Sequence, residues 1–375
     1  MIIPVLVSLV AITLGAHLLT AWLTARRYRT APEAPRDDTT LPYISLIRPV
    51  CGLDTFDAET LASSFTQDYP RYEVIFCAPS ETDPAVALLR DLIAAHPEVE
   101  ASLLCGETAI SRNPKLNNLY KGYGEARSEW VAMTDSNLLL PPDYLRRLVA
   151  TWQAGTGLVT SPPAGIRPGN FWGAVECAFL NSSQGRWQLA ADSLGFGFAQ
   201  GKTLYWNRKV LDAGGGLAAL GRNLAEDVAS TKLVREQGLR VRLTPKLFAQ
   251  PIGARKARAV WDRQLRWSRV RRDGFPLIFA AEIAQGPLVP LGALTALALL
   301  GAAPAAALLA LPPVWYGAEL ALARRAGWPA APRDAAAMLM RDVLLPALWV
   351  ATWTGRGFTW RGTEMAPAES AGPAE

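Results

Sequence analysis

Charged residues and histidine are scarce in this chain of 375 residues. Charged residues make up only 19% of it while hydrophobic residues make up 50%, which predicts that lipid covers part of its surface. The two histidines, His17 and His96, lie far apart, and the four cysteines form no CxxC pair, which argues against a zinc site and a disulfide framework. The net charge of +5 comes without a dense basic arm, so we expect no nucleic-acid partner and expect contacts with phosphates and anionic lipid headgroups.

The first apolar stretch predicts a membrane anchor. Residues 2–24 contain no Asp, Glu, Lys or Arg and reach the length of about 20 apolar residues that spans a bilayer. Arg26, Arg27 and Arg29 follow, so the positive-inside rule predicts that the next domain lies in the cytoplasm. A cleaved signal peptide is the alternative, but the stretch begins without Lys or Arg and is long for one. We therefore expect residues 1–25 to form an anchor.

Residues 276–375 predict further contact with the membrane. The apolar region 276–322 is too long for one span and suits two, roughly 276–297 and 301–322. The last apolar stretch, Met338–Thr354, favours a re-entrant or interfacial helix, because charges lie near its start and beyond its end. These charges are Arg341, Asp342, Arg356 and Arg361. The expectation is a multi-pass protein of the cell inner membrane.

Residues 40–275 read as one domain, preceded by a Pro-rich and polar linker at 30–41. Short β-type runs alternate there with helical patterns, which predicts an α/β fold with a mostly parallel sheet and helices on both faces. The predicted strands are 43–50, 72–79, 100–106 and 130–137, and the predicted helices are 57–66, 84–96 and 117–127. Ligands of such sheets bind beyond the carboxyl ends of the strands, so Pro49, Ser80 and Asp135 are candidate binding residues.

Asp135 ends the run WVAMTDSN and is the candidate metal ligand. A carboxylate there can hold Mg²⁺ or Mn²⁺ between the two phosphates of a nucleotide-sugar. The alternative is a strand-end aspartate that caps a turn. DSN supplies one carboxylate, so the remaining ligands are expected from donor phosphates and water.

Glu226 and Asp227 open a helical pattern after a Gly-rich stretch. Transfer of a group to a hydroxyl needs a base near the acceptor oxygen, and a carboxylate held there can take that proton. The alternative is the ordinary preference of acidic residues for the first turn of a helix.

The segment RQLRW places Arg263 and Arg266 on one face of a predicted helix. The two guanidinium groups can bind pyrophosphate oxygens or an acceptor, and Trp267 can pack against a sugar or a lipid. The alternative is a juxtamembrane basic helix against anionic lipid.

In this order the motifs resemble the inverting glycosyltransferases of the GT-A fold, and among them the ceramide glucosyltransferases. The resemblance covers about residues 40–275. It rests on RPVCGLD (48–54), DYPRYEVIFC (68–77), DPAV (83–86), NPKLNNLYKGY (113–123), DSN (135–137) followed by PPDYL, AED (225–227) and RQLRW (263–267). It implies transfer of a hexose, glucose, from a UDP-sugar to a membrane lipid, ceramide.

The resemblance also implies residue roles. These are uridine contact near Pro49, donor binding by Lys115 and Asp135, a catalytic base at Asp227, and an acceptor-side and pyrophosphate-side motif at Arg263, Arg266 and Trp267. Two positions depart from the animal enzymes of the family. Ser80 stands where they carry an acidic residue after the Cys-containing strand, and Gln184 stands where they carry a histidine.

Three alternatives stay open. Scarce Lys beside abundant Arg and Ala suggests a GC-rich bacterial source, where similar enzymes are named for hopanoid biosynthesis, so the acceptor can be a sterol-like lipid. A processive polysaccharide synthase shares the fold and the RQLRW-type motif but usually has more spans. A catalytically inactive membrane scaffold is the non-enzymatic alternative, against which Asp135, Asp227 and RQLRW argue.

Overall fold

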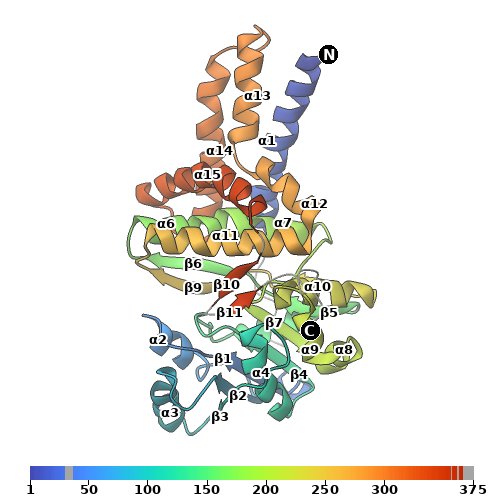
Figure 1. Ribbon diagram of the computed structural model, residues 1–375, viewed down its shortest axis with the longest axis vertical. Helices are drawn as coiled ribbons and strands as arrows, with labels where there is room; N and C mark the ends of the chain where they lie inside the picture. The colour runs from blue at the N-terminus through green and yellow to red at the C-terminus, as the bar shows by residue number, and fades with distance from the viewer. Residues whose placement is uncertain (30–36, 356, 361–362, 366–375) are drawn as a thin grey trace, which may run out of the picture. The chain divides into compact units, whose positions relative to one another are not determined.

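The computed structural model describes residues 1–29, 37–355, 357–360 and 363–365, whose contacts divide the chain into two compact units (Figure 1). Unit 1 contains Met1–Thr30, Ala164–Ala190 and Ile252–Arg356, and unit 2 contains Ala31–Pro163, Ala191–Pro251 and Gly357–Glu375. Most of the predicted linker and the two flanking arginines, Arg356 and Arg361, lie outside the described residues. Each unit joins segments that are distant in sequence, so the boundaries 1–25, 40–275 and 276–375 stay a prediction.

Unit 2 is built around a seven-stranded sheet with the order β3-β2-β1-β4-β7-β5-β8. The strands are β1 (Ile44–Pro49), β2 (Tyr72–Ala78), β3 (Glu100–Cys105), β4 (Trp130–Thr134), β5 (Thr156–Thr160), β7 (Thr203–Asn207) and β8 (Arg240–Leu243). Every neighbouring pair is parallel except β4–β7 and β5–β7. The predicted mostly parallel sheet is therefore confirmed, and β1, β2 and β4 end at the same edge.

Helices cover both faces of this sheet. They are α2 (Asp57–Ala62), α3 (Ala85–Ala95), α4 (Pro114–Glu125), α5 (Tyr144–Thr151), α8 (Arg208–Ala213), α9 (Gly216–Ala219) and α10 (Glu226–Glu236). Successive side chains of a strand point to opposite faces. Thus Leu46 packs in a core with α2, α3 and α5, while the next residue, Ile47, packs with α4, α9 and α10. Two short two-stranded sheets also occur, β6 (Pro163–Pro168) with β9 (Phe248–Gly253) and β10 (Phe358–Trp360) with β11 (Thr363–Met365).

Unit 1 is helical. It contains α1 (Ile2–Arg27), α6 (Phe171–Ala178), a π-helical segment (Phe179–Gly185), the first part of α7 (Arg186–Ser193), α11 (Ala257–Gly274), α12 (Pro276–Ala281), α13 (Leu288–Leu299), α14 (Ala306–Ala326) and α15 (Pro332–Trp353). In Figure 1, α1, α13 and α14 run side by side, while α6, α11 and α15 pack together and lie across them.

Three helices, α1, α14 and α15, are long and apolar enough to cross a membrane, which indicates a membrane protein by length and composition. The first half of the predicted hairpin is not one straight helix, because Pro276–Gln285 and Leu288–Leu299 meet at a bend of 56°. The second half, predicted at 301–322, is α14, which contains Pro312 and Pro313 without ending there. Met338–Thr354 falls on α15 and its C-cap, and its re-entrant or interfacial placement stays a prediction.

Candidate functional site

The backbone at Asp135, directly after β4, is held by a buried arginine. Arg48 in β1 is 0% exposed, and its Nη2 donates to the carbonyl oxygens of Asp135 and Ser136 at 2.8 Å and of Leu138 at 3.0 Å. Its Nη1 donates to the carbonyl oxygen of Thr60 at 2.8 Å. A guanidinium group presents its donors in a rigid fork, so Arg48 fixes the loop after β4 against the sheet.

Lys115 joins three separate segments of unit 2. Its Nζ lies 2.6 Å from Asp135 Oδ1 and 2.7 Å from Glu226 Oε1, and it donates to the carbonyl oxygen of Gly201 at 2.6 Å. Lys115 stands in the first turn of α4, whose N-cap Asn113 accepts from its backbone N–H at 2.9 Å. The N-cap geometry therefore directs this lysine toward the end of β4 and the start of α10.

Glu226, the first residue of α10, is bonded through both carboxylate oxygens. Oε1 accepts from Lys115, and Oε2 accepts from Asn113 Nδ2 at 2.9 Å. A Cβ atom at Gly201 would lie 2.6 Å from Glu226 Oε1. A side chain at this position would therefore displace the Glu226 carboxylate from its place beside the turn before β7.

Lys202 is a site residue that the sequence reasoning missed. Its Nζ lies 2.8 Å from Asp135 Oδ2 and donates to Asn137 Oδ1 at 2.9 Å. The available signal was the polar turn that contains Gly201 and Lys202 directly before the apolar strand β7. Asp135 is thus paired with an ammonium group on each of its oxygens.

These ion pairs set the charges of the cluster. Burial alone would raise the pKa of Asp135, but the ammonium groups of Lys115 and Lys202 outweigh it and lower that pKa below its usual range. Burial alone would lower the pKa of Lys115, but Asp135 and Glu226 outweigh it and raise that pKa. Both partners therefore stay charged at neutral pH.

Asp227 has a different environment from its neighbour. Its Oδ1 accepts from the backbone N–H of Val228 at 2.8 Å, and its Oδ2 accepts from that of Gly201 at 3.3 Å. Burial and the negative charge of Glu226 raise the pKa of Asp227 to about 7, although Lys115 opposes this shift. Asp227 can therefore exchange a proton near neutral pH, as a general base requires.

Pro49 and Ser80 lie at the same edge of the sheet as Asp135. Pro49 is the last residue of β1, and Ser80 is exposed just after β2 with its Oγ 3.0 Å from Thr82 Oγ1. Of the nearby carboxylates, Glu81 forms a surface ion pair at 2.6 Å, and Asp83 accepts from the backbone N–H of Gly52 at 2.9 Å. Asp83 therefore braces the loop that follows Pro49.

The residues of RQLRW lie on α11 in unit 1. Arg263 Nη1 is 3.0 Å from Oε1 of Glu176, a residue of α6 that is 1% exposed and that the sequence reasoning missed. Trp267 packs against the cluster of Cys177, Leu180 and Ile252. Arg266, on the same helix, is half-buried.

Gln184, a position where the chain departs from the animal enzymes, contacts this motif. Its Nε2 donates to Oε1 of the buried Gln264, the second residue of RQLRW, at 2.8 Å. Gln184 belongs to the π-helical segment between α6 and α7. Such segments are frequent at functional sites.

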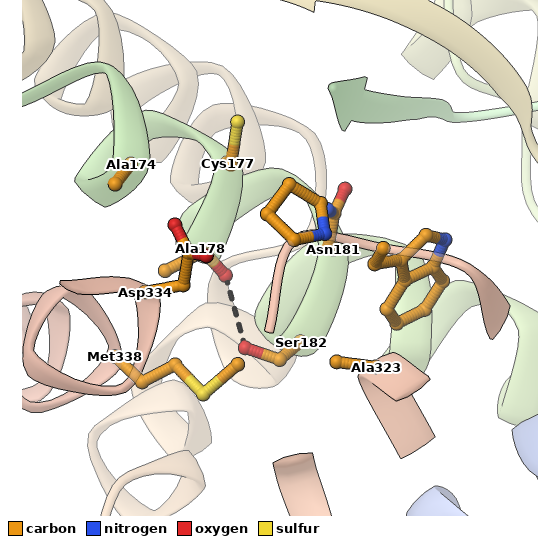
Figure 2. Close-up of a pocket in the computed structure, with 10 residues that line it drawn as sticks. Ala174, Cys177, Ala178, Asn181, Ser182, Ala323, Asp334 and Met338 are labelled. Atoms are coloured by element: carbon orange, nitrogen blue, oxygen red, sulfur yellow. Dashed lines mark hydrogen bonds between the residues drawn. The ribbon is translucent and has the colours of Figure 1, made fainter. Parts of the chain in front are cut away.

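Figure 2 shows a small cavity in unit 1 between this π-helical segment, α14 and α15. Asn181 on its wall exchanges two hydrogen bonds with the backbone of Gly165 at 2.7 and 2.9 Å. Ser182 donates to the carbonyl oxygen of Ala178 at 3.2 Å and accepts from Arg341 at 2.6 Å. These two polar side chains are engaged within the protein, so we attribute the cavity to packing between helices.

The predicted site residues thus form two groups. Lys115, Asp135 and Asp227 form one cluster in unit 2, with Pro49 and Ser80 at the same edge of the sheet. The other group, Arg263, Arg266 and Trp267, lies on one helix of unit 1.

The donor set near Asp135 fits a divalent ion that is shared with a ligand. Within the ranges that the structure describes, no three His, Cys, Asp or Glu side chains are arranged around a metal position. Asp135 Oδ2 and Asn137 Oδ1 nevertheless converge on one cation, the ammonium group of Lys202. Mg²⁺ typically takes one or two protein oxygens and completes its shell with phosphate and water.

The sequence relatives of this chain include curated ceramide glucosyltransferases. Ceramide glucosyltransferase 1 of Caenorhabditis elegans is 30% identical over 250 residues, which cover 66% of this chain and 54% of the relative. Ceramide glucosyltransferase of Komagataella phaffii is 27% identical over 302 residues, 65% of this chain and 58% of the relative. The chain therefore spans a little over half the length of these relatives.

The chain is similar to a solved glycosyltransferase structure and matches a family model over most of its length. The mannosyltransferase from Pyrobaculum calidifontis, solved with GDP-Man and Mn²⁺, matches 94% of this chain and 98% of its own with a TM-score of 0.58 and 21% identity. This match confirms the predicted GT-A fold, and the apolar helices α1, α14 and α15 are consistent with the predicted N-terminal and C-terminal membrane helices. The model of glycosyl transferase family 21 matches residues 3–370. The chain belongs to glycosyl transferase family 21.

Proposed function

We propose that this chain is a membrane-bound hexosyltransferase that transfers glucose from UDP-glucose to a hydroxyl group of a ceramide-like lipid, with inversion at the sugar carbon. The observation that carries the proposal is the cluster in unit 2. It combines a cation position at Asp135 with a separate carboxylate, Asp227, whose pKa is raised to about 7.

On the donor side, Asp135 and Asn137 would hold the divalent ion, with Lys202 beside it. The bound ion supplies positive charge that stabilises the leaving diphosphate. Lys202 adds a donor for a phosphate oxygen. Pro49 and Ser80, at the ends of β1 and β2, would line the nucleoside side of the same edge.

On the acceptor side, Asp227 would accept the proton of the lipid hydroxyl as its oxygen attacks the sugar carbon and the bond to the diphosphate breaks. Glu226 is a poorer candidate for this step, because Lys115 and Asn113 occupy both of its oxygens. The oxygens of Asp227 accept from the backbone N–H groups of Val228 at 2.8 Å and Gly201 at 3.3 Å, whereas Glu226 is ion-paired with Lys115 at 2.7 Å.

Arg263, Arg266 and Trp267, on α11 of unit 1, are proposed to take part in the transfer. Glu176 restrains the Arg263 guanidinium, and Trp267 is anchored by its apolar neighbours. We assign to the two arginines the stabilisation of negative charge on the diphosphate or on the acceptor.

The substrates are proposed from the relatives. The curated relatives from C. elegans and K. phaffii are named ceramide glucosyltransferases, which supports glucose and ceramide. The structural neighbour was crystallised with a nucleotide-sugar and Mn²⁺, which supports a divalent ion. A hopanoid lipid is the alternative acceptor, and it shares the hydroxyl group on an apolar body that this chemistry requires.

We further propose that the catalytic unit faces the cytoplasm at the cell inner membrane. Arg26 and Arg27 close α1, and Arg324 and Arg325 close α14, as the positive-inside rule expects for cytoplasmic ends. An alkaline phosphatase fused near residue 275 should then stay in the cytoplasm and be inactive, and phosphatase activity in the periplasm would overturn this orientation.

The test is transfer by the purified full-length protein in detergent. UDP-glucose would be offered with ceramide or with a hopanoid alcohol, and the lipid products separated and identified by mass. The proposal is supported if the wild type forms glucosylceramide and Asp227→Asn forms it about 10²-fold or more slowly. If only the hopanoid is glucosylated, the acceptor is a hopanoid and not ceramide. If neither lipid gives a product, the proposed function is wrong.

A further inference from the structure

The ammonium group of Lys202 lies where the protein would offer oxygen ligands to a metal ion. It is 2.8 Å from Asp135 Oδ2 and 2.9 Å from Asn137 Oδ1. Carboxylate and amide oxygens are the protein ligands that Mg²⁺ and Mn²⁺ prefer. An internal cation therefore shares the two side chains that would receive the metal.

Charge balance decides when an external cation can enter. Lys115 and Lys202 contribute two positive charges, which Asp135 and Glu226 neutralise. A divalent ion arriving alone would meet two ammonium groups at close range, and like charges in a partly buried site repel strongly. An ion that arrives with a nucleoside diphosphate brings compensating negative charge.

The two lysines differ in how they are held. Lys115 is 10% exposed and is fixed by Asp135, Glu226 and the carbonyl oxygen of Gly201. Lys202 is similarly buried, at 12% exposed, and its ammonium group contacts Asp135 and Asn137 from a flexible four-carbon stem whose backbone is anchored separately. Its N–H donates to Gln200 Oε1 at 2.8 Å, and its carbonyl oxygen accepts from the N–H of Asp135 at 3.1 Å. The ammonium group can therefore move while the turn stays in place.

We propose that Lys202 is an exchangeable internal cation. It occupies the metal position in the donor-free protein and moves onto a phosphate oxygen when the nucleoside diphosphate and the divalent ion bind together. Lys202 thereby makes metal binding depend on the donor. This inference rests on the proposed function for its nucleotide and metal, but neither the sugar nor the lipid enters it.

The experiment is a titration of Mn²⁺ followed by electron paramagnetic resonance, on the full-length protein in detergent, with and without UDP. For the wild type we expect Mn²⁺ to bind at least 10-fold more tightly with UDP than without it. For Lys202→Met we expect the binding of Mn²⁺ without UDP to tighten at least 10-fold, so that the gain from UDP shrinks. Lys202→Arg, which keeps the positive charge, should behave like the wild type.

Two further variants control the experiment. Lys209→Met removes an exposed lysine of unit 2, 75% exposed and paired with Glu129 at 2.9 Å, and should leave Mn²⁺ binding unchanged. Adding Asp135→Asn to Lys202→Met should abolish the gained affinity, because the proposed ligand is then lost.

The inference is overturned if Lys202→Met binds Mn²⁺ without UDP no better than the wild type, or if the wild type already binds it tightly alone. It is also overturned if Mn²⁺ binding by Lys202→Arg no longer depends on UDP. This second variant tests the inference even if Lys202→Met fails to fold. Failure of sugar transfer with the Mn²⁺ results intact would count against the proposed function alone.

Discussion

Glu226 and Asp227 are consecutive residues whose carboxylates have different partners. Glu226 accepts from Lys115 at 2.7 Å and from Asn113 at 2.9 Å, whereas the oxygens of Asp227 accept from backbone N–H groups. Glu226 therefore anchors Lys115, and Asp227 remains the carboxylate able to exchange a proton. The acidic pair alone did not separate the two residues, and the resemblance had assigned the role of base to Asp227.

Asp227→Asn should reduce transfer about 10²-fold or more, as loss of a general base typically does. The amide keeps the size of the side chain and removes its basicity, so the affinity for the nucleotide should change little. The measurement is the transfer rate together with UDP affinity. Near-normal transfer by this variant would remove Asp227 as the base and shift the role to Glu226.

The transfer rate should rise with pH through about 7, the pKa of Asp227. Burial and the charge of Glu226 hold that pKa up, and a base acts only when deprotonated, so activity is lost as pH falls below this value. Glu226→Gln removes the neighbouring negative charge and should move the acid limb to lower pH. An acid limb that stays in place in this variant would contradict the assigned cause of the shift.

The first half of the sheet in unit 2 was predictable because its evidence is local. The runs that became β1, β2, β3 and β4 are apolar and bounded by turns, and Asp135 visibly ends the last of them. The second half was not predicted. There β7 lies between β4 and β5 and is antiparallel to both. Its position in the sheet therefore does not follow from the order of the strands along the chain.

The site residues that were not predicted from the sequence contact partners that lie far from them in the sequence. Lys202 contacts Asp135, Arg48 contacts the loop after β4, and Glu176 contacts Arg263. Each is an ordinary polar residue in its own segment, and only the fold supplies its partner. The sequence could identify Asp135 and Asp227 as candidates because a strand end and a helix start are local features.

Asp135→Asn should weaken binding of the nucleotide-sugar as well as lower the transfer rate. The amide cannot neutralise Lys115 and Lys202, and it is a poorer metal ligand than a carboxylate. Isothermal titration with UDP and Mn²⁺ would separate this variant from Asp227→Asn. If both variants bind UDP like the wild type, Asp135 has no role on the donor side.

Arg48→Met should destabilise the protein and raise KM for the donor. It removes the Arg48 donor from the carbonyl oxygens of Asp135, Ser136 and Leu138, of which that of Asp135 keeps the N–H of Leu138 at 3.3 Å, and a buried acceptor left unpaired costs about 1–3 kcal/mol. The control is Arg90→Met, which removes a surface arginine whose side chain is 63% exposed. Thermal unfolding and donor titration should leave the control unchanged. A stable Arg48→Met variant with normal donor KM would show that the loop holds its shape without the arginine.

Four buried charged groups on α7, α14 and α15 of unit 1 form a balanced set. Glu319 on α14 is 0% exposed and lies 3.0 Å from Arg341 and 3.8 Å from Arg186, while Arg341 also lies 2.9 Å from Asp342. Two arginines thus face two carboxylates. Ionisable groups inside a membrane unit are stable only when paired in this way.

Glu319→Gln should therefore cost stability of about 3–5 kcal/mol, because it leaves one buried arginine charge uncompensated. The double variant Glu319→Gln with Arg341→Met removes one charge of each sign and leaves Arg186 to pair with Asp342. It should be more stable than the single variant, since apolar replacement of a buried pair is often neutral. Thermal unfolding of both proteins in the same detergent makes the comparison. If the double variant is instead the less stable one, packing around Arg341 rather than charge balance holds α14 against α15.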